Sequence, residues 1–242
     1  MIDDTKNLPL RPMSDNIKKD SPSVEKETVS KTNKKTQQVA ARFAKDMDAF
    51  LKSEPKTLSR NIDTYPLSHE IQEIINNYPG ISESEKKTVE EKLSKTYYAG
   101  IHTPYMGGRR EMLLQKLLGT QVIPADAAER SKGTYLLWRG LRDDQLVMMV
   151  INGSAGNQKA DPNASAPSEA SSILQVGEKE SLPEFTTNPA IAEQFGTNHN
   201  VCVFRLRGRD LTPGSGTEAG YIVNQNAPAE LILYKKGRGL TI

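Results

Sequence analysis

The chain has 242 residues, enough for one large domain or for a smaller domain with an extension. Its formal charge is only +2 and no block of basic residues is left unbalanced by acids, which excludes the basic face typical of nucleic-acid-binding proteins. The hydrophobic share of 36% is low, so we expect part of the chain to stay outside a core.

The same inventory argues against metal and disulfide chemistry. The single cysteine, Cys202, allows no intramolecular disulfide and no cysteine-based zinc site, and its apolar neighbours predict a small buried side chain. The three histidines (His69, His102 and His199) lack the spacing of metal ligands. We therefore expect no metal cofactor. No apolar run approaches the roughly 20 residues that a membrane-spanning helix needs, so no membrane span is expected.

Residues 1–36 are rich in Lys, Asp, Ser, Thr, Asn and Pro and contain almost no aromatic residues. Such a segment cannot bury enough apolar area to offset its ordering entropy, so we expect a disordered tail. Two interpretations stay open, a flexible tail and a signal for contact-dependent secretion. The N-terminus lacks the basic start and apolar segment of a Sec signal peptide. The protein is therefore expected in the cytoplasm or on an export route that reads no such peptide.

Helical periodicity dominates residues 37–132, where apolar side chains recur every three or four positions. The expected helices are residues 39–51, 68–77 with Ser68 as N-cap, 82–97 with Ser82 or Ser84 as N-cap, and 110–118. Nothing in this part indicates chemistry, and it is expected to form a helical layer before the rest of the chain.

Residues 133–242 are rich in strands. The expected strands are Thr134–Trp138, Val201–Leu206, Gly220–Val223 and Glu230–Tyr234. The apolar run Leu146–Ile151 leaves helix and strand both open. Asn152–Ser172 is rich in Gly, Ala, Ser, Asn and Pro, which predicts a long flexible loop, either a lid or a disordered insertion. The sequence thus predicts an α+β fold.

Three short motifs in this half carry candidate chemistry. Arg139 closes the hydrophobic strand 135–139 and precedes Gly140. The run 185–195 places a hydroxyl pair, Thr186 and Thr187, ahead of a helix that Asn188 or Thr187 can cap and Pro189 can begin. Glu230 opens an apolar strand. In this order the motifs resemble the arginine–hydroxyl–glutamate signature of mono-ADP-ribosyltransferase toxins, over about the last 110 residues.

The resemblance implies an ADP-ribosyltransferase-like mixed β-sandwich core at 133–242, preceded by the helical part at 37–132, within one catalytic domain at 37–242. It also implies an NAD+–protein ADP-ribosyltransferase with NAD as co-substrate. The bond from nicotinamide to ribose breaks with oxocarbenium character. Arg139 would hold the pyrophosphate through bidentate hydrogen bonds. Glu230 would stabilise the ribosyl cation, and Thr186 would hold that carboxylate in place.

Further residues take roles by the same resemblance. Those expected to line the NAD site with Arg139 are Gly140, Phe185, Thr186 and Thr187. Those expected to contact the acceptor are Tyr221, Gln225 and Asn226. The chain departs from the family at Asn188, where Ser is usual, and at Pro228, where Glu or Gln is common. Because Pro228 has no hydrogen-bonding side chain, an arginine acceptor is disfavoured and other acceptors stay open.

The functional expectation is a monomeric, secreted bacterial effector that modifies a host protein inside the host cell. An NAD glycohydrolase toxin is the first alternative. A non-catalytic binding module with this fold is the second. Glu230→Ala is expected to abolish NAD consumption if the three groups converge on one crevice.

Overall fold

In the computed structural model, the described residues are 38, 41–43, 45–50, 67–97, 114, 116–168, 182–196, 199–214, 216 and 219–236. The expected disordered tail, residues 1–36, lies outside them. The chain divides into two compact units, Met1–Gln38 and Val39–Ile242, and the fold below is that of the second. Among the described residues, no helix is both long enough and apolar enough to cross a membrane.

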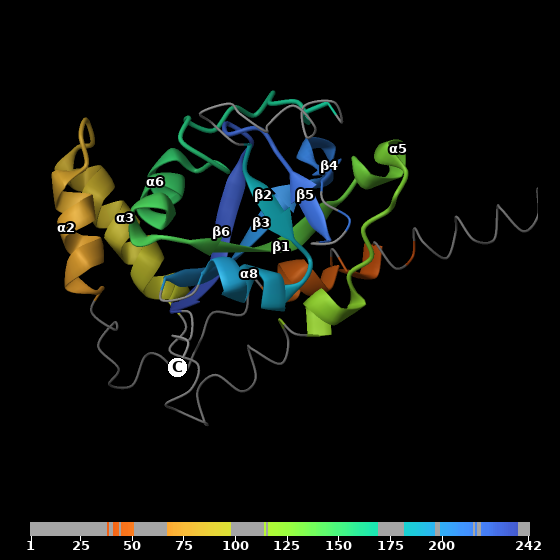
Figure 1. Cartoon of the computed structure of the whole chain (residues 1–242), viewed down its shortest axis with the longest axis horizontal. Helices are drawn as coiled ribbons and strands as arrows, with labels where there is room; N and C mark the ends of the chain where they lie inside the picture. Colours follow the sequence, from red (N-terminus) through yellow and green to blue (C-terminus); the bar gives the residue numbers. More distant parts are fainter. Residues whose placement is uncertain are drawn as a thin grey trace, which may run out of the picture. The chain divides into compact units, whose positions relative to one another are not determined.

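A six-stranded antiparallel sheet with the strand order β4-β5-β2-β1-β3-β6 organises this unit (Figure 1). The strands are β1 (Thr134–Leu141), β2 (Glu184–Thr186), β3 (Asn200–Arg207), β4 (Thr212–Pro213), β5 (Gly220–Ile222) and β6 (Ala229–Lys236). The helices are α2 (His69–Asn77), α3 (Glu83–Thr96), α5 (Ala127–Arg130), α6 (Asp143–Asn152), α8 (Pro189–Phe195) and the 3₁₀ turn η1 (Gly208–Asp210). The expected α+β class and the four expected strands are confirmed.

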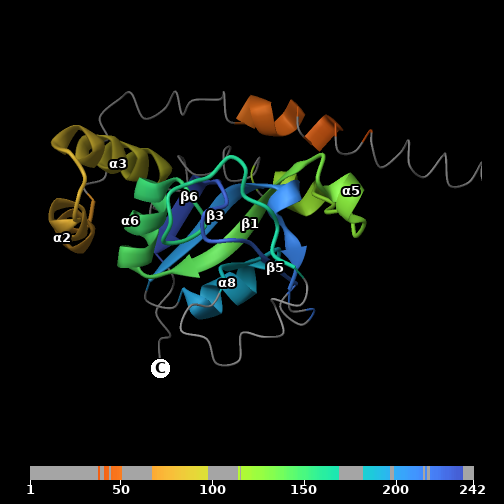
Figure 2. The ribbon, with the colours of Figure 1, turned by 90° about the horizontal axis from the view of Figure 1, so that it is seen from above.

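Alternation along β1 defines two faces of the sheet, with α6 and α8 on opposite sides (Figure 2). Leu137, Arg139 and Leu141 point to the side that we call the α6 face, where Leu137 and Leu141 join the cluster of α6 side chains. Trp138 and Gly140 point to the other side, which we call the α8 face because α8 packs on Gly140. Partners in neighbouring strands share a face, so the register of β1 assigns the residues of β2 and β3 as well.

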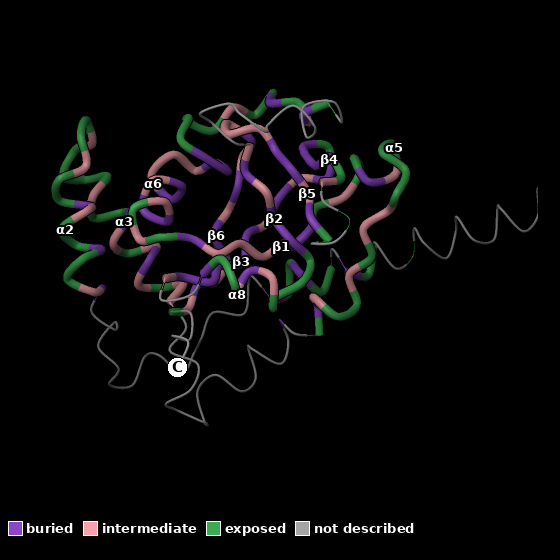
Figure 3. Tube along the Cα trace, viewed as in Figure 1, coloured by how far each residue is buried: buried purple, intermediate pink, exposed green. Residues whose placement is uncertain are grey.

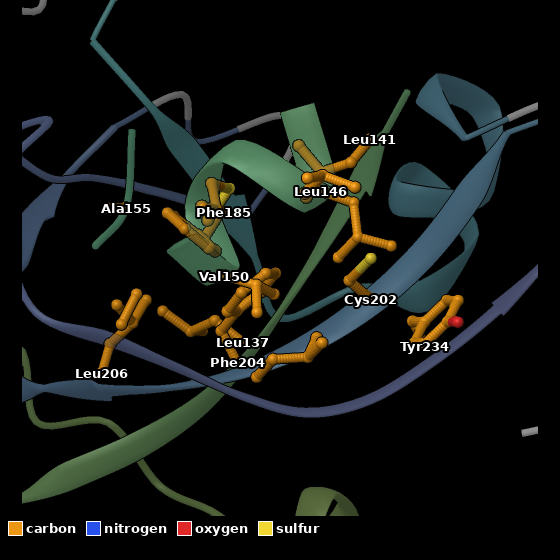
Figure 4. Close-up of a cluster of buried hydrophobic side chains, with 14 of the residues drawn as sticks. Leu137, Leu141, Leu146, Val150, Ala155, Phe185, Cys202, Phe204, Leu206 and Tyr234 are labelled. Carbon is orange, nitrogen blue, oxygen red and sulfur yellow. The ribbon is translucent and has the colours of Figure 1, made fainter. Parts of the chain in front are cut away.

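The main hydrophobic core fills the α6 face (Figure 4). Helix α6 lies on the sheet, and α2 and α3 pack against α6. The apolar run Leu146–Ile151, for which the sequence allowed either a helix or a strand, is therefore helical. Helix α2 begins after Ser68, whose hydroxyl accepts a hydrogen bond from the Ile71 amide at 3.4 Å. Helix α3 begins after Ser82, which forms a reciprocal capping box with Glu85. Both expected caps are confirmed.

A smaller cluster covers part of the α8 face. It joins strand residues to helical segments at 41–50 and 114–120, of which residues 44 and 115 lie outside the described part. Its buried members are Phe43, Met47, Phe50, Leu114, Leu117, Leu136, Val203 and Ile232. Trp138 packs at its border. The periodic apolar residues near the start of the domain are thus part of the core.

Residues 153–168, which we call the strap, follow α6 and run over the end of the sheet near β5 and β6 (Figure 3). The strap begins at Gly153, whose φ of 62° ends α6 in the left-handed conformation. Backbone hydrogen bonds join it to the segment before β6, from the Ala155 amide to the Ala227 carbonyl at 2.8 Å and from the Asp161 amide to the Asn226 carbonyl at 2.9 Å. The expected loop is confirmed for this part, which hydrogen bonds attach to the rest of the domain, while residues 169–172 lie outside the described residues.

Arginine side chains clamp the far half of the strap. Arg207 and Arg209 both donate to the Pro162 carbonyl. Arg207 is fixed in turn by two hydrogen bonds to the fully buried carboxylate of Asp210, at 2.6 and 3.0 Å. A buried carboxylate costs little when a guanidinium pairs with both of its oxygens. The clamp therefore orders a segment whose composition alone predicts disorder.

A β-bulge interrupts the alternation of β6. Val203 pairs with Leu233, but its neighbour Phe204 pairs with Leu231, so Ile232 is the extra residue. Tyr234, opposite Cys202, points to the α6 face, and strict alternation from it would place Glu230 there too. The bulge reverses this: Glu230 pairs with Arg205, which is opposite Leu136 on the α8 face.

Candidate functional site

The strands that carry the first two motifs are neighbours. Trp138 of β1 pairs with Thr186 of β2, and β2 pairs in turn with β5, with Phe185 opposite Tyr221 and Thr186 opposite Gly220. Pairing continues one residue further, where the Thr187 amide donates to the Ala219 carbonyl at 3.2 Å. The central strands β1, β2 and β5 therefore bring Arg139, the hydroxyl pair and Tyr221 into one region of the sheet.

Arg139 is the most unusual charge in this region. Its Nη1 donates to the Ala155 carbonyl of the strap at 2.8 Å and lies 3.7 Å from the Met149 sulfur. Its guanidinium carbon is 5.1 Å from the centre of the Phe185 ring, a cation–π distance. Burial lowers the pKa of Arg139 to about 10, so the group stays cationic at neutral pH.

The charge of Arg139 is not neutralised by a carboxylate among the residues that the structure describes; its partners there are a carbonyl, a thioether and an aromatic ring. Arginine has five N–H donors, and these contacts use only Nη1. A desolvated cation with donors to spare favours an anionic ligand that can bind in a bidentate manner. The residue as a whole is partly exposed, while its charged group is desolvated.

The two threonines of the second motif differ in environment. Thr186 is 5% exposed, points to the α8 face beside Trp138, and accepts a hydrogen bond at its hydroxyl from the Asn188 amide at 2.9 Å. Asn188 then caps α8, its side-chain oxygen accepting from the Ala190 amide at 3.0 Å. Thr187 is exposed in the bend after β2, where its hydroxyl donates to the Ala219 carbonyl at 3.5 Å. Thr186 therefore lies on the face opposite Arg139.

Ala219, opposite Thr187, has strained backbone geometry. Its φ is 48°, the one positive value among the described residues other than glycine. A residue with a Cβ occupies this left-handed region at a cost of about 1–2 kcal/mol. Strain of this kind is concentrated at binding and catalytic sites, where the surrounding structure enforces it. The position next to the hydroxyl pair is thus held in place against its own preference.

Glu230 is not brought to Arg139. It lies on the α8 face, it forms an ion pair with Arg205 of β3, and two strands, β1 and β3, separate its strand from β2. Adjacent strands are about 4.8 Å apart, so three spacings place Glu230 and Thr186 roughly 14 Å from each other across the sheet. The expected convergence of Arg139, Thr186 and Glu230 on one crevice is wrong, because the bulge in β6 turns Glu230 away and alternation in β2 turns Thr186 away.

Gly140 packs against α8. An added Cβ there would lie 2.3 Å from the Gly196 nitrogen and 2.5 Å from the Ala192 oxygen, the two atoms of the bond that closes the C-terminus of α8. Helix and strand thus approach too closely for any side chain or ligand atom between them. The structure gives Gly140 a packing role, and its contact with NAD stays a prediction.

Replacing this glycine should be costly. Gly140→Ala is expected to lower the free energy of unfolding by roughly 1–3 kcal/mol, because α8 must move to accept the methyl group. Urea unfolding followed by circular dichroism measures the change. Gly119→Ala is the matched control, since nothing lies within 4 Å of a Cβ added there. Equal stability of the two variants would contradict the close approach of α8.

The remaining predicted residues lie on β2, on β5 and in the segment that follows β5. Tyr221 is partly buried opposite Phe185, and Phe185 is buried with its ring edge-on to Phe204 at 5.7 Å. Gln225 packs on Gly156 of the strap, and Asn226 accepts the strap hydrogen bond described above. Contact of these residues with an acceptor stays a prediction.

Two features of this region were not predicted from the sequence. The first is the strap, which supplies the carbonyl that accepts a hydrogen bond from Arg139. Its start at the end of α6 is indicated in the sequence by Gly153, the glycine that follows an apolar run. Cys202 lies beside Arg139 on the α6 face, where burial raises the pKa of its thiol. No group of three or more His, Cys, Asp or Glu side chains in the described part of the chain could hold a metal ion.

Comparison with known proteins gives a family without an assigned function. The family described as a domain of unknown function (DUF4765) matches residues 122–234. That span begins before α5 and ends within β6, so it contains all six strands almost completely, the strap and every candidate site residue. Helices α2 and α3 lie outside it. No curated protein matches the chain.

Proposed function

We propose that the protein is an NAD-dependent mono-ADP-ribosyltransferase whose NAD site is formed on the α6 face by Arg139 and Phe185, with Thr187 in the bend after β2. The observation that carries the proposal is Arg139: a cation in a desolvated position, with unused donors and no carboxylate partner among the described residues. Such a group suits the pyrophosphate of a dinucleotide, which offers two adjacent anionic groups to a planar guanidinium. The core fold proposed with it is the ADP-ribosyltransferase-like sandwich.

The reaction also requires a carboxylate beside the ribose to stabilise the developing positive charge. Glu230 is on the other face of the sheet, so we propose Glu218 in its place. Glu218 lies outside the described residues. In the sequence it precedes Ala219, the residue that pairs with Thr187 and has the strained backbone.

In the proposed mechanism Arg139 fixes the pyrophosphate, and the Glu218 carboxylate stabilises the ribosyl cation as the bond from ribose to nicotinamide breaks. An acceptor side chain then attacks the anomeric carbon and loses its proton to solvent or to a neighbouring base, and nicotinamide leaves as the neutral amide. Tyr221, Gln225 and Asn226, on and after β5, are proposed to contact the acceptor, a host protein if the chain is an exported bacterial effector.

A second candidate is a non-catalytic binding module, and one observation favours it: the ion pair of Glu230 with Arg205 removes the carboxylate that the sequence motif supplied. One experiment separates the candidates. NAD labelled in its adenosine half is incubated with the protein and a eukaryotic cell lysate. Label fixed on a macromolecule is the expected result. Release of free ADP-ribose alone would mean that the protein is an NAD glycohydrolase. If NAD stays unchanged and calorimetry detects no binding of NAD, the protein is the non-catalytic binding module.

A further inference from the structure

The guanidinium of Arg139 is oriented by a part of the molecule that touches no substrate in the proposed reaction. The carbonyl that accepts from Nη1 belongs to Ala155, a fully buried strap residue. The amide of Ala155 is held at the same time by the Ala227 carbonyl at 2.8 Å. The peptide groups on both sides of Ala155 are thus fixed, one by the segment before β6 and the other by Arg139.

Ser154 shapes the turn that presents this carbonyl. Its side chain is fully buried, and its hydroxyl lies within hydrogen-bond distance of two strap carbonyls, those of Gly156 at 3.2 Å and of Gln158. A bridge to Pro228 and a hydrogen bond from the Ala229 amide to the Gly153 carbonyl, at 3.0 Å, hold the start of the turn against β6. The Gly156 carbonyl also accepts a hydrogen bond from the Asn152 side chain, at the longer distance of 3.4 Å. Loss of the Ser154 hydroxyl removes the shorter contact to Gly156 and the contact to Gln158, which favours opening of the turn.

We infer that Ser154 is a positioning residue for Arg139: its hydroxyl closes the turn at residues 154–158 and so sets the direction of the Ala155 carbonyl that orients the guanidinium. This inference rests on the proposed function for its catalytic consequence. Its structural part concerns Arg139 alone. Because the strap also carries the packing of Gly156 on Gln225, the same turn connects the arginine with the segment proposed to contact the acceptor.

The first measurement concerns Arg139 without any substrate. Nitrogen-15 spectra of the arginine side chains are recorded, and the Arg139 signals are assigned by their loss in Arg139→Lys. A guanidinium held at one Nη rotates slowly about its Cζ–Nε bond, so separate Nη signals are expected in the natural chain. In Ser154→Ala they should merge through faster rotation. Ser165→Ala is the control, because Ser165 is an exposed strap residue whose backbone carbonyl, not its hydroxyl, makes the contact with Asn224.

The second measurement concerns NAD. Ser154→Ala is expected to raise KM for NAD by about tenfold and to change kcat by less than about twofold, because a misplaced guanidinium weakens binding of the pyrophosphate rather than the chemical step. Gly156→Ala is a second variant that reaches the strap by another route, since an added Cβ would lie 2.8 Å from the Gln225 Cβ and push the strap outward. It should raise KM in the same way.

These measurements test the positioning role of Ser154 and the proposed function separately. Unchanged Arg139 signals in both Ser154→Ala and Gly156→Ala would overturn the positioning role, whether or not the protein uses NAD. Altered signals with an unchanged KM would overturn its catalytic consequence. A natural chain that neither binds nor consumes NAD would remove the proposed function, and the nitrogen-15 spectra would still decide the structural part.

Discussion

Arg139→Lys is expected to raise KM for NAD by about tenfold to a hundredfold, the equivalent of losing one or two charge-assisted hydrogen bonds. Lysine keeps the charge but lacks the planar fork that binds pyrophosphate in a bidentate manner and the Nη1 donor that the Ala155 carbonyl accepts from. Initial rates of nicotinamide release at varied NAD concentration measure the effect. The rate at saturating NAD should fall less than the affinity.

Arg142→Lys is the matched control for this variant. Arg142 lies three positions along the chain, is exposed, and pairs with Asp144 at 2.9 Å. Exposed ion pairs contribute about 0–1 kcal/mol, so neither activity nor thermal stability should change much. An unchanged KM in Arg139→Lys, with a folded protein, would make Arg139 a structural cation and would remove the observation on which the proposed function rests.

Glu218→Gln should reduce kcat by about a hundredfold to a thousandfold, the range found when one stabilising group is removed from a preorganised site. Glutamine keeps the size of the side chain and removes the charge that stabilises the ribosyl cation. Glu230→Gln should retain most of the activity, because Glu230 lies on the α8 face and its partner is Arg205. Single-turnover release of labelled nicotinamide compares the two variants on the chemical step.

The reverse pattern, loss of activity in Glu230→Gln alone, would show that the active form of β6 differs from the one described and that the bulge is not fixed. Loss in both variants together with a lowered unfolding temperature would indicate damage to the sheet. Circular dichroism melts of the same samples therefore accompany the rate measurements.

Local signals explain what could be predicted from the sequence. The caps of α2 and α3 lie at Ser68 and Ser82 because a hydroxyl and, for α3, a glutamate three residues later satisfy backbone groups within one turn. Asn188 and Pro189 begin α8 for the same local reason. The strands follow from their apolar runs. None of these features depends on distant parts of the chain.

What could not be predicted depends on pairing between distant segments. Alternation within β1 separates Trp138 from Arg139, but only the register with β2 shows that Thr186 lies with Trp138. The face of Glu230 depends on a bulge at Ile232, and an apolar run such as Leu231-Ile232-Leu233 contains no sign of it. The strap is ordered by Arg207, Arg209 and Asp210, some forty residues further along the chain.

The burial of Cys202 has a practical consequence for studying this protein. The only thiol in the chain is fully buried and its pKa is raised, so alkylating reagents should not react with it in the folded state. A new cysteine at an exposed strap position, such as Asn157 or Asn163, would then accept a fluorophore or spin label alone. The natural chain thus serves unaltered as the background for single-site reporters that compare the strap with and without added nucleotides.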